Sequence, residues 1–216
     1  PLLVVDKHEM GSNSTFFFSP AAEDQINPLF AEEAYQITAE LSQVLYDVFD
    51  GIGQLSVSQE FFPNFYLGFG SSYPSLLGAV PFLFEQGSSR GMLQDTDNGL
   101  KRYDDTITEQ FQAAIALLGE AAQQRQRLQD FQQRWFADAA EKARENPTKA
   151  YMFTSSDQGR FAHFLDLLNA HSIDVRMLSE TQSIDGVVYP AGRSAIVSLN
   201  QPRYSLIEGI FARQSP

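Results

Sequence analysis

Short apolar runs and helical repeats alternate along the first half of the chain. Residues 2–5 form an apolar run that is typical of a buried, central strand, and residues 80–85 form a second one that ends at a carboxylate. Between them, apolar residues recur at helical spacing, which predicts one amphipathic helix over about residues 30–50. Gly51 and Gly53 are expected to end that helix.

A longer helical pattern covers residues 104–145. Its apolar positions mark one stripe: Phe111, Ile115, Leu118 and Ala122. After a polar gap, the stripe continues at Leu128, Phe131 and Trp135. Asn146-Pro147 is expected to end the helix, because the residue before a proline disfavours helical geometry. This helix also offers a surface for a second copy of the chain, and the oligomeric state stays open.

The remainder of the chain alternates between strands and helices. We expect strands at residues 149–154, 175–178 and 195–199, and helices at residues 158–170 and 202–212. This alternation favours a small, partly parallel α/β unit. The sequence therefore predicts an α/β protein with a boundary near Pro147, which divides it into residues 1–146 and 147–216.

Composition and charge exclude several classes of function. The chain has no cysteine, so it has no disulfides, thiolate metal sites or cysteine nucleophiles, and its compartment is not decided by that absence. Its net charge is −12, and residues 1–100 hold two bases, Lys7 and Arg90, against thirteen acids. Such an acidic surface repels phosphate backbones, so we expect no nucleic-acid partner. No apolar run approaches the ~18 residues of a membrane span.

Two polar residues next to the apolar runs are candidates for chemistry. His8 follows the first run and Glu85 ends the second, and the carboxyl ends of strands in α/β sheets are where ligands bind. Two interpretations of His8 are open, a metal ligand or a polar residue at a strand end. For Glu85 the alternatives are a general base, with a pKa raised by desolvation, or a structural carboxylate that caps a helix N-terminus or pairs with Arg90.

The other histidine patterns do not indicate a site. The zincin motif H-E-x-x-H would need a second histidine where Ser12 stands. His163 falls within a predicted helix and His171 follows its end, where a cation is favourable.

Two longer segments carry a family resemblance. Residues 4–11, VVDKHEMG, resemble the strand and histidine that supply the last zinc ligand in carboxypeptidase A-like zinc peptidases, particularly their bacterial branch. The segments GSSYP at 70–74 and GAVPFLFEQGSSRG at 78–91 resemble the approach to the catalytic glutamate of that family. The likeness covers about residues 1–100, with both segments in the family's order.

The resemblance implies hydrolysis of a peptide or related amide, with zinc as cofactor, His8 as a zinc ligand and Glu85 as the general base. Tyr66 matches the family's substrate-binding tyrosine, with Tyr73 as the rival, and Arg90 would face a substrate carboxylate. The family's other two ligands come from an H-x-x-E motif that precedes the histidine, and this sequence contains no H-x-x-E. We therefore expect the chain to be a fragment that lacks the first zinc motif and is inactive by itself.

Residues 147–216 resemble a glutamine amidotransferase-like region that some bacterial members carry. The likeness lies in residues 185–192, DGVVYPAG, and in Gln201-Pro202. Without cysteine, this region cannot perform thiol-based amidotransfer, so an accessory role is expected. The family resemblance also implies a periplasmic or secreted location.

A second hypothesis is a non-catalytic module that binds peptides or cell-wall fragments on a degenerate peptidase scaffold. Its binding surface would be the aromatic stretch of residues 61–69.

Overall fold

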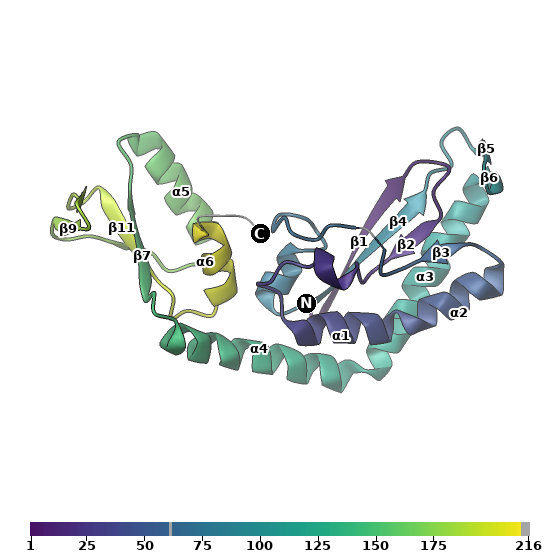
Figure 1. The fold of residues 1–216 in the computed structure, drawn as a ribbon, viewed down its shortest axis with the longest axis horizontal. Coiled ribbons are helices and arrows are strands. Elements are labelled where there is room, and N and C mark those ends of the chain that lie inside the picture. Colours follow the sequence, from purple (N-terminus) through teal and green to yellow (C-terminus); the bar gives the residue numbers. More distant parts are fainter. Residues whose placement is uncertain (61, 213–216) are drawn as a thin grey trace. The chain divides into compact units, whose positions relative to one another are not determined.

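The computed structural model describes residues 1–60 and 62–212, and it confirms the α/β class with mixed sheets. The chain forms two compact units, one over residues 1–134 and one that begins at Trp135 (Figure 1). The division falls inside helix α4 (Arg125–Glu145), upstream of the boundary that the sequence suggests near Pro147.

A mixed four-stranded sheet organises the first unit. Its strands stand in the order β1 (Leu3–Met10), β4 (Val80–Gly87), β2 (Phe16–Phe18) and β3 (Ser56–Val57). Strands β1 and β4 are parallel, whereas β2 is antiparallel to β4. The prediction of a buried strand at residues 80–85 is confirmed by β4. The prediction of a central strand at residues 2–5 is wrong, because β1 is longer, half-buried and at the edge of the sheet as far as the described residues extend.

A phenylalanine layer covers one face of this sheet. Because successive residues of a strand point to opposite faces, four phenylalanines of β2 and β4 share that face: Phe16, Phe18, Phe82 and Phe84. They pack against α1 (Glu32–Leu41) and α2 (Gln43–Ile52), and the ring centroids of Phe16 and Phe49 are 4.4 Å apart. This layer is the hydrophobic core of the unit.

The helix predicted over residues 30–50 is in fact two helices that meet at Ser42. The Ser42 hydroxyl donates to the carbonyl of Ala39 at 2.7 Å, a local bond that competes with the helical ladder. Of the two glycines predicted to end the helix, Gly53 does so and caps α2 with a φ of 70°, whereas Gly51 lies within α2.

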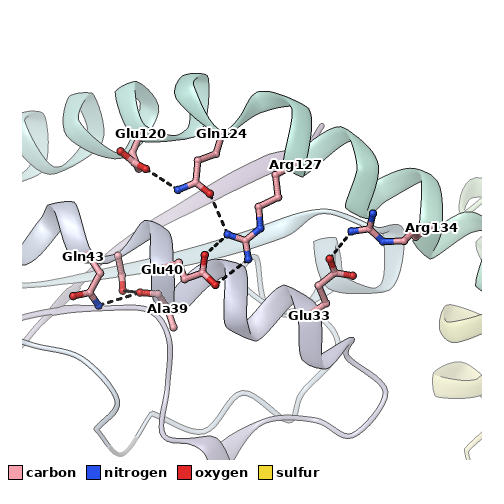
Figure 2. A network of polar contacts seen from close by, with 9 residues as sticks. Glu33, Ala39, Glu40, Gln43, Glu120, Gln124, Arg127 and Arg134 are labelled. Carbon is pink, nitrogen blue, oxygen red and sulfur yellow. Dashed lines mark hydrogen bonds and ion pairs between the residues drawn. The ribbon is translucent and has the colours of Figure 1, made fainter.

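The long helix predicted over residues 104–145 also divides in two. Helix α3 (Tyr103–Gln123) ends at Gln124, and α4 follows directly and ends, as predicted, before Asn146-Pro147. Ion pairs tie the first half of α4 to α1. Figure 2 shows Arg127 contacting both Glu40 and Gln124, and Arg134 contacting Glu33. These pairs are partly exposed, so each contributes at most about 1 kcal/mol.

Helix α3 packs through a different face from the one its apolar stripe suggests. Phe111 is 64% exposed, and Ile115, Leu118 and Ala122 are exposed as well. The buried positions are Thr106, Glu109, Ala113 and Leu117. The apolar stripe of residues 111–122 is therefore not the face through which α3 packs on the described residues.

A hairpin that the sequence analysis did not identify joins the sheet to α3. It consists of β5 (Leu93–Thr96) and β6 (Gly99–Arg102). Lys101 of β6 donates to the carbonyl of Ser14 at 2.9 Å. Two short 3₁₀ helices, Glu23–Gln25 and Tyr73–Leu77, complete the first unit.

The second unit contains a three-stranded sheet in the order β7 (Ala150–Thr154), β11 (Ser194–Ser198) and β8 (Arg176–Met177). Its helices are α5 (Gln158–Ala170) and α6 (Tyr204–Phe211), and a hairpin joins β9 (Gln182–Ile184) to β10 (Val187–Tyr189). These strands and helices lie close to their predicted positions. The prediction of partly parallel pairing is wrong, because β11 lies between β7 and β8 and pairs antiparallel with both.

Among the residues that the structure describes, none of the helices is both long enough and apolar enough to cross a membrane.

Candidate functional site

Strand register brings His8 and Glu85 to the same side of the sheet. His8 lies directly opposite Glu85 in the parallel β1–β4 pair, and partners at the same register of such a pair face the same side. Asp6, two residues before His8, shares that side. Lys7 lies between them and reaches the other side, where its Nζ donates to the carbonyl of Gln110 on α3. His8 and Glu85 therefore lie within their strands, not beyond the strand ends as expected.

The side of the sheet that faces away from the phenylalanine layer forms one wall of a cavity of about 680 Å³. Asp6, His8 and Glu85 line this wall. The loop after β3 supplies the opposite wall with Phe62, Phe65, Tyr66 and Phe69, and Phe17 of β2 completes an aromatic lining. Phe61, the first residue of the aromatic stretch, lies outside the described residues. The cavity thus brings three polar candidates together under aromatic rings.

Buried hydrogen bonds hold the aromatic loop in place. Asn27 is almost completely buried, and its side-chain amide donates to the carbonyl of Phe65 at 2.7 Å. Its backbone N–H donates to the carbonyl of Asn64, and the Asn64 N–H donates to the carbonyl of Gln25. The Ser72 hydroxyl contacts the side chain of Asn64 as well. These bonds fix the loop from both of its ends.

Asp6 orients the imidazole of His8. Nε2 of His8 lies 3.0 Å from Oδ1 of Asp6, and the side chains are 55% and 23% exposed. A carboxylate at this distance favours the tautomer with its proton on Nε2, which leaves Nδ1 with a free lone pair. The sequence alone does not assign this role to Asp6, because residues two apart in a strand share a face but do not always touch.

Gly70 permits this position of Asp6. A Cβ at Gly70 would lie 2.3 Å from Oδ2 of Asp6, far inside van der Waals contact. Only a glycine lets the aromatic loop pass so close to the carboxylate of β1.

Glu85 has the electrostatic environment of a proton acceptor. It is 8% exposed, and burial raises the pKa of its carboxyl above the ordinary value. His8 lowers this pKa and Asp6 raises it, which shows that the three groups share one electrostatic environment. A carboxylate of raised pKa is the type that moves protons in hydrolysis. Arg90 does not form the expected ion pair with Glu85 among the described contacts.

The three candidate substrate-binding residues differ in whether they line the cavity. Tyr66 lines the cavity, is 65% exposed, and packs edge-to-face on Phe69 with centroids 5.1 Å apart. Tyr73 begins a 3₁₀ helix, is half-buried and does not line the cavity. Arg90 is exposed and also lies outside the cavity. Of the two rival tyrosines, only Tyr66 is therefore positioned with His8 and Glu85.

Sequence reasoning did not identify Phe17, Ser19, Asn64 and Ser71, which also line the cavity. Phe17 lies between two other phenylalanines, and all three are buried, so hydrophobicity did not distinguish it from Phe16 and Phe18. The other three carried no signal, since their approach depends on the path of two loops.

Among the described residues, His8 is the predicted metal ligand. Across residues 1–60 and 62–212, no group of three or more histidine, cysteine, aspartate and glutamate side chains is arranged to hold a metal ion. The donor chemistry of His8 does fit one ligand, because its Nε2 faces Asp6 and its Nδ1 is left for coordination. The resemblance implies the same single ligand in this segment.

A scan against protein-family models and searches of curated proteins and solved structures find no significant match to this chain. The family resemblance therefore stays a prediction.

Proposed function

We propose that residues 1–134 carry part of the active site of a zinc-dependent peptidase, or of a related amidase. The observation that supports this most is the direct pairing of His8 with Glu85 on one side of the sheet, inside one cavity. In the proposal, His8 is one zinc ligand and Glu85 is the general base.

Glu85 performs the proton transfers. Its buried carboxyl accepts a proton from the attacking water and then gives it to the nitrogen of the leaving amine. A raised pKa suits the first step, because it makes the carboxylate a stronger base toward water, and the protonated carboxyl is still acidic enough to donate to the leaving amine.

Asp6 and His8 together form the proposed zinc-binding part of the site. Asp6 holds Nε2 of His8, so that Nδ1 is free to bind zinc. Bound zinc would polarise the scissile carbonyl and lower the pKa of water. Because a catalytic zinc takes three protein ligands, we propose that the other two come from a segment outside this sequence.

Tyr66 is the proposed substrate-binding residue. Its ring is exposed at the cavity and its position next to Phe69 leaves it accessible to a bound peptide. The earlier candidates Tyr73 and Arg90 lie outside the cavity, so we do not give them this role.

The experiment uses the complete protein that contains this segment, with zinc content measured by elemental analysis. Peptide hydrolysis is followed by mass spectrometry on a library of N-acylated peptides. We expect His8→Ala to lose zinc and activity together. Glu85→Gln should keep zinc but lose activity by about 10²- to 10⁴-fold, the usual contribution of a general base.

His163→Ala is the matched control, because this histidine is exposed on α5 in the second unit. It should change neither zinc content nor hydrolysis. Full zinc content in His8→Ala, or full activity in Glu85→Gln, would contradict the proposal.

A non-catalytic binding module is the second candidate. The described residues lack a complete metal site, and the exposed rings of Tyr66 and Phe69 offer a surface for a peptide or a glycan. If the complete protein holds no zinc but binds such ligands, and Tyr66→Ala abolishes the binding, this function replaces the first.

A further inference from the structure

The rings of the cavity form two pairs. Phe17 and Phe62 stack with centroids 4.5 Å apart and an interplanar angle of 17°. Tyr66 and Phe69 meet edge-to-face, and both are largely exposed. Both rings line the cavity, and the π face of an aromatic ring attracts cations.

The charges in the cavity favour the same sign of ligand. Its lining includes the carboxylates of Asp6 and Glu85 with His8, and none of the described lining residues is lysine or arginine. Both carboxylates line the same cavity, and groups of like charge repel each other. A cation placed near them would relieve this repulsion, whereas an anion would add to it.

The charge balance of the first 100 residues is also negative. Residues 1–100 hold two bases against thirteen acids. A cleft inside a field of one sign raises the local concentration of oppositely charged ligands.

We propose that the aromatic cavity receives a cationic group of the ligand, the ammonium or guanidinium of a basic peptide side chain. The π faces of Tyr66 and Phe69 hold the cation, and Asp6 supplies the nearest carboxylate that is not needed for proton transfer. The inference rests on the proposed function in one respect only, namely that the cationic group belongs to a substrate of the peptidase. Binding itself requires neither zinc nor turnover.

The test compares three probes that share one ring and differ in charge: benzylammonium, benzyl alcohol and phenylacetate. Dissociation constants are measured by ligand-observed NMR on the unmodified chain at low and high salt. We expect benzylammonium to bind at least about fivefold more tightly than benzyl alcohol, the ratio that corresponds to about 1 kcal/mol of cation–π attraction. Phenylacetate should bind most weakly, and salt should reduce the differences.

Three variants distinguish binding by the cavity residues from attraction by the net negative charge of the chain. Tyr66→Leu and Asp6→Asn should each weaken benzylammonium binding and leave benzyl alcohol almost unchanged. Asp50→Asn removes an equal charge from the exposed end of α2 and should have little effect.

Equal binding of benzylammonium and benzyl alcohol would overturn the proposal. So would an Asp50→Asn effect as large as that of Asp6→Asn, because the preference would then belong to the whole surface. Neither result bears on zinc or on Glu85, so failure here is distinguishable from failure of the proposed function.

Discussion

Replacing Gly70 by alanine tests how the aromatic loop and strand β1 meet. The new Cβ would lie 2.3 Å from Oδ2 of Asp6, whereas ordinary contact begins near 3.4 Å. The φ of Gly70 is not in the left-handed region, so the backbone accepts alanine. The carboxylate of Asp6 must therefore retreat by about 1 Å, away from the position in which it holds His8.

We expect Gly70→Ala to change the orientation of the His8 side chain more than it changes the free energy of unfolding. Losing a partly exposed ion pair costs about 0.2–1 kcal/mol. Alanine in place of glycine recovers about 0.4–1 kcal/mol, because it restricts the unfolded chain. The free energy of unfolding should thus change little. Loss of the carboxylate that orients a metal-binding histidine typically lowers metal affinity about 10- to 100-fold.

Two measurements report on this change. Urea unfolding gives the stability of the chain, and the imidazole resonances of His8 in ¹H–¹⁵N NMR report the loss of Asp6 as a partner. Zinc affinity of the complete protein gives the functional consequence. The matched control is Gly51→Ala in α2, where a Cβ would meet nothing within 4 Å. It should raise stability by about 0.5–1 kcal/mol and leave His8 unchanged.

The reasoning is refuted if the His8 resonances of Gly70→Ala match those of the wild-type chain. It is also refuted if Gly51→Ala disturbs His8 as much as Gly70→Ala does.

Two further predictions concern stability. The pKa of Glu85 is raised in the folded state, so the native chain binds a proton at Glu85 more readily than the unfolded chain. The ionised carboxylate of Glu85 therefore destabilises the folded state, and Glu85→Gln should be more stable than wild type at pH 7. In urea titrations this advantage should shrink as the pH falls through the raised pKa, and it should be gone below about 4.5, where the carboxyl is protonated in both states. On α3, Leu117→Ala should cost about 2–5 kcal/mol because Leu117 is fully buried, whereas Phe111→Ala should cost less than about 0.5 kcal/mol. Similar losses in thermal unfolding would show that the exposed stripe is buried in solution.

The sequence predicted best those elements whose pattern is local. The span of α5 matches its prediction, and the apolar run of residues 80–85 is the buried core of β4. The choice of His8 and Glu85 as candidates also rested on the sequence, because His8 follows one apolar run and Glu85 ends the other. Their pairing at one register is visible only in the structure.

Tertiary packing decided what the sequence did not show. The apolar stripe of α3 contains larger side chains than its packed face, so hydrophobicity alone indicated the wrong side. Strand direction in the second unit depends on where β11 inserts, and alternation of elements carries no information about that. The contact of Asp6 with His8 depends on a close approach that a single glycine, Gly70, allows.

The central claim is that His8 on β1 and Glu85 on β4 are register partners whose side chains point to the same side of the sheet. The chain has no cysteine, so a pair of introduced cysteines reports this directly. Neighbouring partners in a sheet fall within the roughly 4.4–6.8 Å between Cα atoms that a disulfide requires. Mild oxidation of the His8→Cys/Glu85→Cys variant should give an intramolecular cross-link in mass spectrometry, and Lys7→Cys/Glu85→Cys should not. A cross-link in the second variant but not in the first would place the strands one residue out of register, with His8 and Glu85 on opposite faces, and would contradict the account.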